Sequence, residues 1–178
     1  MNKKQIRKLA YGGVFTGLIL VATMFLQIPT GLGGYVNLGD GVIFASAIFL
    51  GPFAGICGAL GAGVADLLLS YGLYAPATFI IKGIMGLFAG LMLHQKTHEK
   101  QGKKDSWARA YIFTTLVFLI AEVIMVAGYF VFEWFVLGLD VALPSILPNV
   151  VQGVAGIAVG LALMPVMKKV MENEYYGT

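Results

Sequence analysis

Long apolar stretches divided by three charged segments constrain this chain more than any other feature of its sequence. Of its 12 basic and 9 acidic residues, fifteen lie in the segments 3–8, 96–109 and 168–174. Only 12% of the 178 residues are charged and 58% are hydrophobic, whereas about a quarter of the residues in a soluble domain carry charge. A soluble enzyme and a disordered chain are therefore excluded, and a single cysteine, Cys57, excludes a disulfide scaffold. The sequence predicts an all-α integral membrane protein.

The apolar stretches have the lengths that helices need in a bilayer. A helix of about 20 residues crosses roughly 30 Å of hydrocarbon. We predict a single transmembrane domain, 1–178, that is a bundle of six transmembrane helices near 7–27, 40–51, 53–70, 76–93, 108–133 and 145–167. The breaks between them lie close to Pro29, Pro52, Pro76 and Pro144. The second helix is too short for an upright crossing, so we expect protein to cover its ends.

The distribution of basic residues predicts the orientation. With an even number of crossings, the N-terminus, the 94–108 loop and the C-terminal tail share one side. That side holds every Lys and Arg of the chain except Lys82. Because loops rich in Lys and Arg stay in the cytoplasm, both termini are expected to be cytoplasmic. The expected location is the bacterial plasma membrane, with multiple crossings.

Six charged residues remain inside or beside the apolar stretches, and each is a candidate for function because a charge in a membrane helix is costly. They are Asp40, Asp66, Lys82, Glu122, Glu133 and Asp140. Counted along the predicted helices, Asp40, Asp66, Lys82 and Glu122 lie in the outer half, as do Asn149 and Gln152. Glu133 and Asp140 are expected to be solvated charges at the outer interface. The sequence predicts a polar cup that opens to the exterior.

The sequence leaves more than one role open for each buried charge. Asp66 and Lys82 either contact a ligand or neutralise each other as a buried pair between two helices. Glu122 has no evident basic partner, so we expect it to be protonated, hydrogen-bonded or in contact with a ligand. In the first helix, Gly13 and Gly17 form a GxxxG pattern, which packs against a helix of this chain or of a partner.

Several functional motifs are missing from the sequence. There is no GxxxxGK[ST] phosphate loop, no nucleophile elbow and no HExxH. We expect no catalytic residues, no metal and no cofactor, and no nucleic-acid partner. Three classes of protein remain: a membrane-embedded binding protein that works with partners, a stand-alone facilitator or proton-coupled carrier, and an intramembrane enzyme.

Specific residues add a family resemblance. They are 37–44 (NLGDGVIF), 50–52 (LGP), Gly55, Gly61, 65–68 (ADLL), Tyr71, 74–78 (YAPAT) and 80–83 (IIKG). With these residues the chain resembles the substrate-binding S components of energy-coupling factor (ECF) vitamin transporters, in the branch for riboflavin, pyridoxine and hydroxymethylpyrimidine. It implies no enzymatic activity. It implies a subunit that binds a vitamin or precursor at the outer side and topples in the membrane to deliver it. The partners implied are a transmembrane coupling protein and two cytoplasmic ATPases.

The resemblance also implies which residues act. A small-xxx-small motif on the first helix docks on the coupling protein in this family, and Gly13 and Gly17 match it here. The family's ligand pocket uses the loop after the first helix and helices four to six. By position these are Tyr35, Asn37, Lys82, Glu122, Asn149 and Gln152, together with Asp40 and Asp66, which contact the ligand or hold the scaffold. The branch resemblance favours pyridoxine or hydroxymethylpyrimidine over riboflavin.

Overall fold

The computed structural model describes residues 2–31, 34–99 and 107–175, and nearly all of them are helical. Two short strands and one 3-10 turn complete the order of elements. That order is α1 (Lys3–Phe25), β1 (Gln27–Pro29), β2 (Tyr35–Asn37), α2 (Gly39–Leu50), η1 (Gly51–Phe53), α3 (Ala54–Leu68), α4 (Ala75–Glu99), α5 (Trp107–Leu137) and α6 (Leu139–Tyr175).

Five helical stretches in the described part of the chain are long and apolar enough to cross a membrane. They are Gln5–Phe25, Gly39–Leu68, Ala75–His94, Trp107–Leu137 and Leu139–Met171. The predicted second and third helices together form the Gly39–Leu68 stretch, which η1 interrupts. The structure is thus that of an all-α, multi-pass membrane protein.

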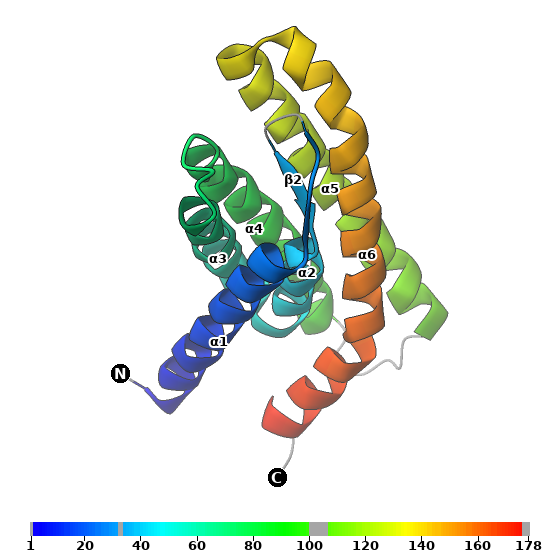
Figure 1. Ribbon diagram of the computed structural model, residues 1–178. Coiled ribbons are helices and arrows are strands. Elements are labelled where there is room, and N and C mark those ends of the chain that lie inside the picture. Colours follow the sequence, from blue (N-terminus) through cyan, green and yellow to red (C-terminus); the bar gives the residue numbers. More distant parts are fainter. Residues whose placement is uncertain (1, 32–33, 100–106, 176–178) are drawn as a thin grey trace.

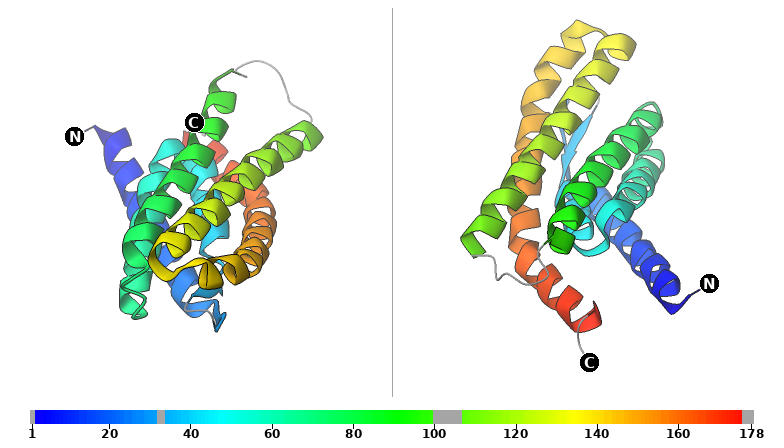
Figure 2. Two further views of the ribbon diagram at one scale, coloured as in Figure 1. Left: turned by 90° about the horizontal axis from the view of Figure 1, so that it is seen from above. Right: turned by 180° about the vertical axis from the view of Figure 1, so that it is seen from behind.

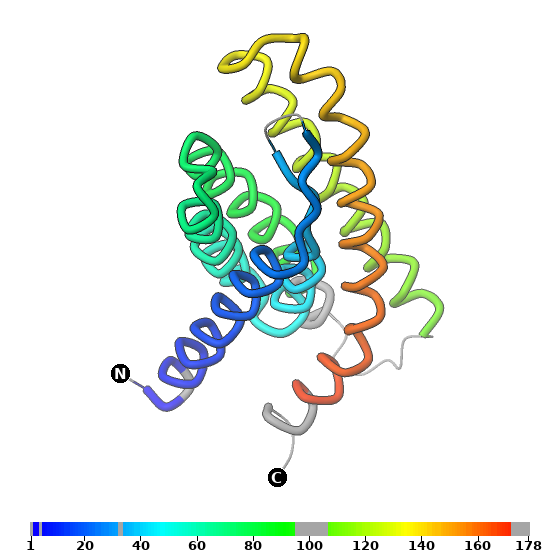
Figure 3. Tube along the Cα trace, in the orientation of Figure 1, coloured from blue at the N-terminus to red at the C-terminus, as the bar shows by residue number. Residues whose placement is uncertain are grey.

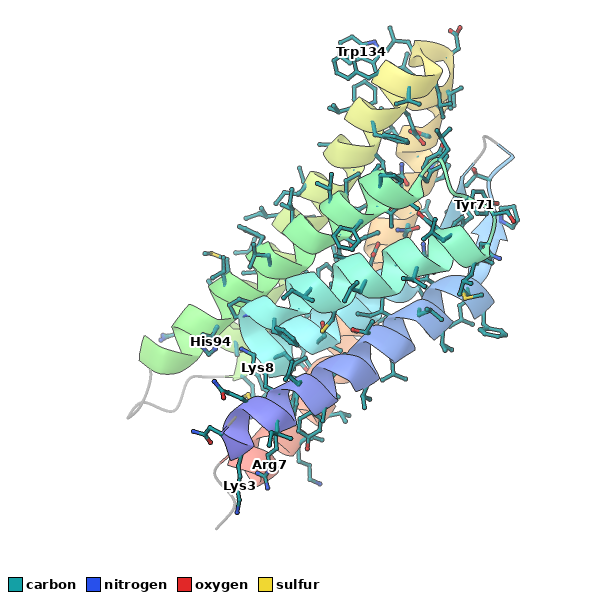
Figure 4. The ribbon with its side chains drawn as sticks, turned by 90° about the vertical axis from the view of Figure 1, so that its left-hand side faces the viewer. Lys3, Arg7, Lys8, Tyr71, His94 and Trp134 are labelled. Carbon is teal, nitrogen blue, oxygen red and sulfur yellow. The ribbon has the colours of Figure 1, made fainter. Side chains whose placement is uncertain are left out.

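The helices run up and down between two ends of the molecule (Figure 1, Figure 3). α1 begins and α6 ends at one end, where α4 also ends and α5 begins. The β-hairpin, the α3–α4 turn and the α5–α6 turn extend toward the other end. Viewed from behind, α5 and α6 lie side by side as a long antiparallel pair (Figure 2). Side chains follow the same division, since Lys3, Arg7 and Lys8 lie at one end and Tyr71 and Trp134 at the other (Figure 4).

The central helix is α2, which contacts α1, α3, α4 and α6. Its 12 residues span about 18 Å at 1.5 Å each. Most of them are buried, including Phe44, which stacks on Phe118 of α5 with ring centroids 3.9 Å apart. The prediction of a short second helix whose ends are covered by protein is confirmed. This helix brings Asp40 into the centre of the bundle.

Small residues let α3 and α4 approach closely. A Cβ on Gly55 of α3 would lie 2.8 Å from the Gly83 carbonyl oxygen, and a Cβ on Gly86 of α4 would lie 2.8 Å from the Ala54 carbonyl oxygen. Side chains at either position would push the helices apart. These small residues therefore form the surface between α3 and α4.

One local prediction was wrong. Pro144 does not mark the start of the last helix, because α6 begins at Leu139 and contains Pro144 within it. The break falls at Gly138, whose φ of 92° suits glycine, and membrane helices tolerate internal proline. The loop expected after the first helix also contains a small antiparallel hairpin, in which Ile28 pairs with Val36.

Candidate functional site

A polar cavity lies at the end of the bundle that carries the β-hairpin. It encloses about 440 Å³ of empty space, including its open mouth. Its lining comes from the helices α1, α3, α4, α5 and α6, from strand β2 with the residue before it, and from the α3–α4 turn. The residues are Thr23, Gly34, Tyr35, Asn37, Ala62, Asp66, Tyr71, Tyr74, Thr78, Lys82, Tyr129, Glu133, Asn149 and Gln152. Four tyrosine rings and several hydrogen-bonding groups therefore face one small space.

A chain of hydrogen bonds forms one side of this cavity. The Lys82 ammonium bonds the Asp40 carboxylate, with Nζ and Oδ1 2.5 Å apart, and the two side chains are 2% and 0% exposed. The amide of Gln152 donates from Nε2 to the other Asp40 oxygen at 2.7 Å. Gln152 Oε1 accepts from the backbone N–H and the side-chain amide of Asn37, at 3.0 and 3.1 Å. This chain of hydrogen bonds ties α2, α4 and α6 to strand β2.

Two tyrosine–carboxyl pairs form other parts of the lining. The Tyr35 hydroxyl donates to Asp66 Oδ1 at 2.5 Å, and the Tyr74 hydroxyl donates to Glu133 Oε1 at 3.1 Å. The Ser145 hydroxyl contacts the second Glu133 oxygen. Burial raises the pKa of the Tyr35 and Tyr74 phenols well above the usual value, and the neighbouring carboxylate raises it further. Both phenols therefore stay protonated and keep donating at physiological pH.

The structure brings most of the predicted site residues together. Tyr35, Asn37, Lys82, Asn149 and Gln152 all line the cavity. Asp66 lines it as well, but it does not form the buried pair with Lys82 that was considered, because Lys82 bonds Asp40 and Asp66 accepts from Tyr35. Asp40 is fully buried behind the lining, where it holds Lys82 and Gln152.

Glu122 occupies a deeper position between α5 and α6. A Cβ on Gly156 would lie 2.7 Å from Glu122 Oε1 and 2.8 Å from Asp40 Cβ, so both acidic side chains pack on this glycine. Glu122 is 4% exposed, and neither of its carboxyl oxygens has a hydrogen-bond partner in the described part of the chain. It does not line the polar cavity but belongs to an apolar groove between α5 and α6.

The sequence analysis misplaced one acidic residue, Glu133, and missed two further residues of the lining, Tyr129 and Thr78. Glu133 was expected to be a solvated interfacial charge, but it is 4% exposed and hydrogen-bonded, whereas Asp140 is exposed as expected. Tyr129 and Glu133 follow Glu122 by seven and eleven residues, which places all three on one helix face. Thr78 likewise precedes Lys82 by one turn, and its hydroxyl hydrogen-bonds Tyr129 at 2.9 Å. The helical period was the signal that could have found them.

The glycines of α1 lie on two different faces. A Cβ on Gly12 would overlap the Phe53 ring, so this face packs inside the protein. Gly13 and Gly17 are exposed, and a Cβ on either would meet no described atom within 4 Å. The GxxxG pattern is therefore not used for packing among the described residues and remains an open surface on α1.

Replacement of Gln152 by leucine is expected to lower the free energy of unfolding by about 2 kcal/mol, because Asn37 and Asp40 each lose a buried hydrogen bond. Chemical denaturation in detergent measures this. Hydrogen exchange at the Asn37 amide should accelerate, whereas Val151→Leu, at an exposed neighbouring position, should change neither quantity. Unchanged protection of Asn37 would show that Gln152 does not anchor β2.

Replacement of Glu122 by methionine is expected to raise the free energy of unfolding by about 1–3 kcal/mol, since it removes a buried carboxyl without hydrogen bonds from an apolar groove. Glu133→Met should have the opposite effect, because it removes a carboxyl that is hydrogen-bonded. Denaturation of the two variants in the same detergent compares them. A loss of stability in Glu122→Met would indicate a partner for its carboxyl.

Comparisons with known proteins show the family of this chain. A family model described as "ECF-type riboflavin transporter, S component" matches residues 3–169. The thiamine precursor transporter HmpT of Lactococcus lactis subsp. cremoris (strain MG1363) is 27% identical over 172 residues, which cover 95% of this chain and 92% of HmpT. An uncharacterized protein of the gap 3' region in Pyrococcus woesei is 30% identical over 153 residues, 85% of this chain and 95% of that protein. The matched family consists of transporter components and is not an enzyme family. With nearly its whole length matched, the chain belongs to the family of ECF-type riboflavin transporter S components.

Proposed function

We propose that this protein is the S component of an ECF-type transporter that binds a small water-soluble vitamin or vitamin precursor in the polar cavity. The observation that carries the proposal is the cavity itself, which combines four tyrosines with amide, ammonium and carboxyl groups at one end of an apolar bundle. Tyrosine rings suit the faces of a heteroaromatic ring, and the polar groups suit its edge. The proposed ligand contacts are Tyr35, Asn37, Lys82, Asn149 and Gln152.

The size of the cavity supports a small ligand. Its empty space is at most about 440 Å³, because this volume includes the open mouth. Pyridoxine or hydroxymethylpyrimidine is therefore favoured over the larger riboflavin. The relative HmpT is by its name a thiamine precursor transporter, which agrees with this choice.

The proposed topology has six helices, with α2 as the short one, and both termini in the cytoplasm of a bacterium. The helix ends that carry Lys3, Arg7 and Lys8 lie opposite the end that carries Tyr71 and Trp134 (Figure 4). Because basic residues stay on the cytoplasmic side, the cavity then opens outward. A ligand from outside would reach it without crossing the bilayer.

Delivery requires partners, for which the open glycine face of α1 is the proposed docking surface. Gly13 and Gly17 leave space on α1 that another helix can enter closely. A transmembrane coupling protein would occupy that space, and two cytoplasmic ATPases would supply the energy. In this proposal Asp40 and Glu122 support the bundle beneath the cavity and do not touch the ligand.

Titration calorimetry on the purified protein tests the binding step. Pyridoxine, 4-amino-5-hydroxymethyl-2-methylpyrimidine and riboflavin are added separately, and native mass spectrometry identifies any co-purified molecule. The proposal expects one of the two smaller compounds to bind with a dissociation constant in the micromolar range or below, roughly −8 kcal/mol or tighter. The absence of any bound or co-purified vitamin-like molecule would contradict it.

A stand-alone proton-coupled carrier is the second candidate. One observation favours it, namely that Glu122 is a buried carboxyl with no hydrogen bond in the described residues. Such a group, together with Asp66, could carry a proton across the membrane. Uptake by the lone protein in liposomes, driven by a pH gradient without ATP, would support this candidate.

A further inference from the structure

The charged groups that line the cavity indicate which ligands it can bind, beyond what the shape of the cavity indicates. Among the described residues that line it, the charged groups are Lys82, Asp66 and Glu133. Lys82 is already bonded to Asp40, and its ammonium lies 5.5 Å from the centroid of the Tyr129 ring. Its positive charge is thus neutralised within the protein. Among the residues that the structure describes, the lining offers two carboxyl groups and no unpaired cation.

The two carboxyl groups are fixed in place. Asp66 on α3 accepts from Tyr35, and Glu133 on α5 accepts from Tyr74 and contacts Ser145. Each carboxyl has two oxygens with several acceptor positions, so each can accept further hydrogen bonds from a ligand. A ligand between them meets hydrogen-bond acceptors.

Several backbone donors near the cavity are already used. A helix N-terminus commonly binds phosphate through its free N–H groups, and α4 begins at Ala75 beside the cavity. In its first turn, the N–H groups of Ala75 and Thr78 donate to the carbonyl oxygens of Tyr71 and Tyr74, and Pro76 has none. At the N-terminus of α2, the Gly39 N–H donates to Asn37 Oδ1.

We propose that the cavity selects an uncharged or protonated heterocycle with amino or hydroxyl donors and rejects its phosphate ester, with Glu133 and Asp66 as the specificity-determining residues. This rests on the proposed function of the cavity. A phosphate would bring nearly two negative charges toward two carboxyl groups, and no free cation stands beside them in the described part of the lining. Repulsion at close range in a partly dehydrated site is strong, whereas amino and hydroxyl groups find acceptors there.

Matched pairs of ligands test the selection directly. The probes are pyridoxine, 4-amino-5-hydroxymethyl-2-methylpyrimidine and riboflavin, each measured against its own phosphate monoester by titration calorimetry on the full-length protein. The alcohol that binds should do so about a hundredfold or more tightly than its ester. An ester that binds within about threefold of its alcohol would overturn the selection while leaving the binding function intact. If none of the six compounds binds, the proposed function fails, and the inference fails with it.

Variants of Glu133 and Asp66 test whether these two residues cause the preference for the alcohol over its phosphate ester. Glu133→Gln removes one charge from the lining and should narrow the preference for the alcohol by about tenfold. Asp140→Asn removes the same charge from an exposed position in the first turn of α6 and should leave the preference unchanged. Asp66→Asn provides a second test at the other carboxyl if Glu133→Gln is not stable. An unchanged preference in both lining variants would refute their role.

Discussion

Replacement of Lys82 by methionine is expected to lower the free energy of unfolding by about 3–5 kcal/mol, the cost of breaking a buried ion pair from one side. The reason is that Asp40 is 0% exposed and has Lys82 as its cation. Without Lys82, the Asp40 carboxylate must remain unpaired or take up a proton. If it takes up a proton, the Gln152 amide loses a charged acceptor. Thermal unfolding in detergent, followed by a thiol-reactive dye at the buried Cys57, measures the loss.

Two controls accompany this variant. Lys169→Met removes the same ammonium from an exposed position on α6 and should leave the stability unchanged. The double variant Asp40→Asn with Lys82→Met removes both charges and should recover a large part of the loss, because no uncompensated charge remains. A single variant Lys82→Met with normal stability would contradict the central role of this pair.

The second large effect is expected on α1. Gly13→Leu and Gly17→Leu should each leave ligand affinity normal and abolish ATP-driven uptake, because leucine would hold a partner helix away from the open glycine face. Affinity is measured on the isolated protein, and uptake is measured in liposomes with the coupling protein, the ATPases and ATP. Ala162→Leu adds bulk at an exposed position of α6 and should not affect either measurement.

The glycines of α1 allow an effect on partner docking to be distinguished from an effect on folding. A Cβ on Gly13 or Gly17 meets no described atom, whereas one on Gly12 overlaps Phe53. Gly12→Leu should therefore destabilise the protein itself, while the other two variants should fold normally. If Gly13→Leu and Gly17→Leu assemble with the coupling protein and transport at the normal rate, the docking surface lies elsewhere.

The sequence predicted the helices well because their signal is local. Apolar length and the three charged segments place most helix ends, and the short second helix follows from its length alone. The predicted bounds 76–93 and 145–167 are too short, because α4 ends at Glu99 and α6 spans Leu139–Tyr175. Pro144 misled the last boundary because a membrane helix can contain proline, whereas Gly138 is the residue that makes the turn. The hairpin was missed because strands of three residues give almost no periodic signal.

The pairing inside the site could not be predicted, because it depends on how helices rotate against one another. Asp40, Asp66 and Glu122 all had a depth that suited Lys82, and only the packed bundle shows that Lys82 meets Asp40. The position of Glu133 near the end of α5 suggested solvent, but Tyr74 and Ser145 enclose it. Sequence gives depth along each helix, and tertiary packing decides which groups touch.

Uptake of radiolabelled 4-amino-5-hydroxymethyl-2-methylpyrimidine and pyridoxine into liposomes tests the central claim most directly. The protein is reconstituted alone and together with the coupling protein and both ATPases, each with and without ATP. We expect accumulation of one of these ligands only when all partners and ATP are present, and binding without accumulation by the lone protein. Accumulation by the lone protein without ATP, or none with the complete complex and ATP, would contradict the assignment as an S component.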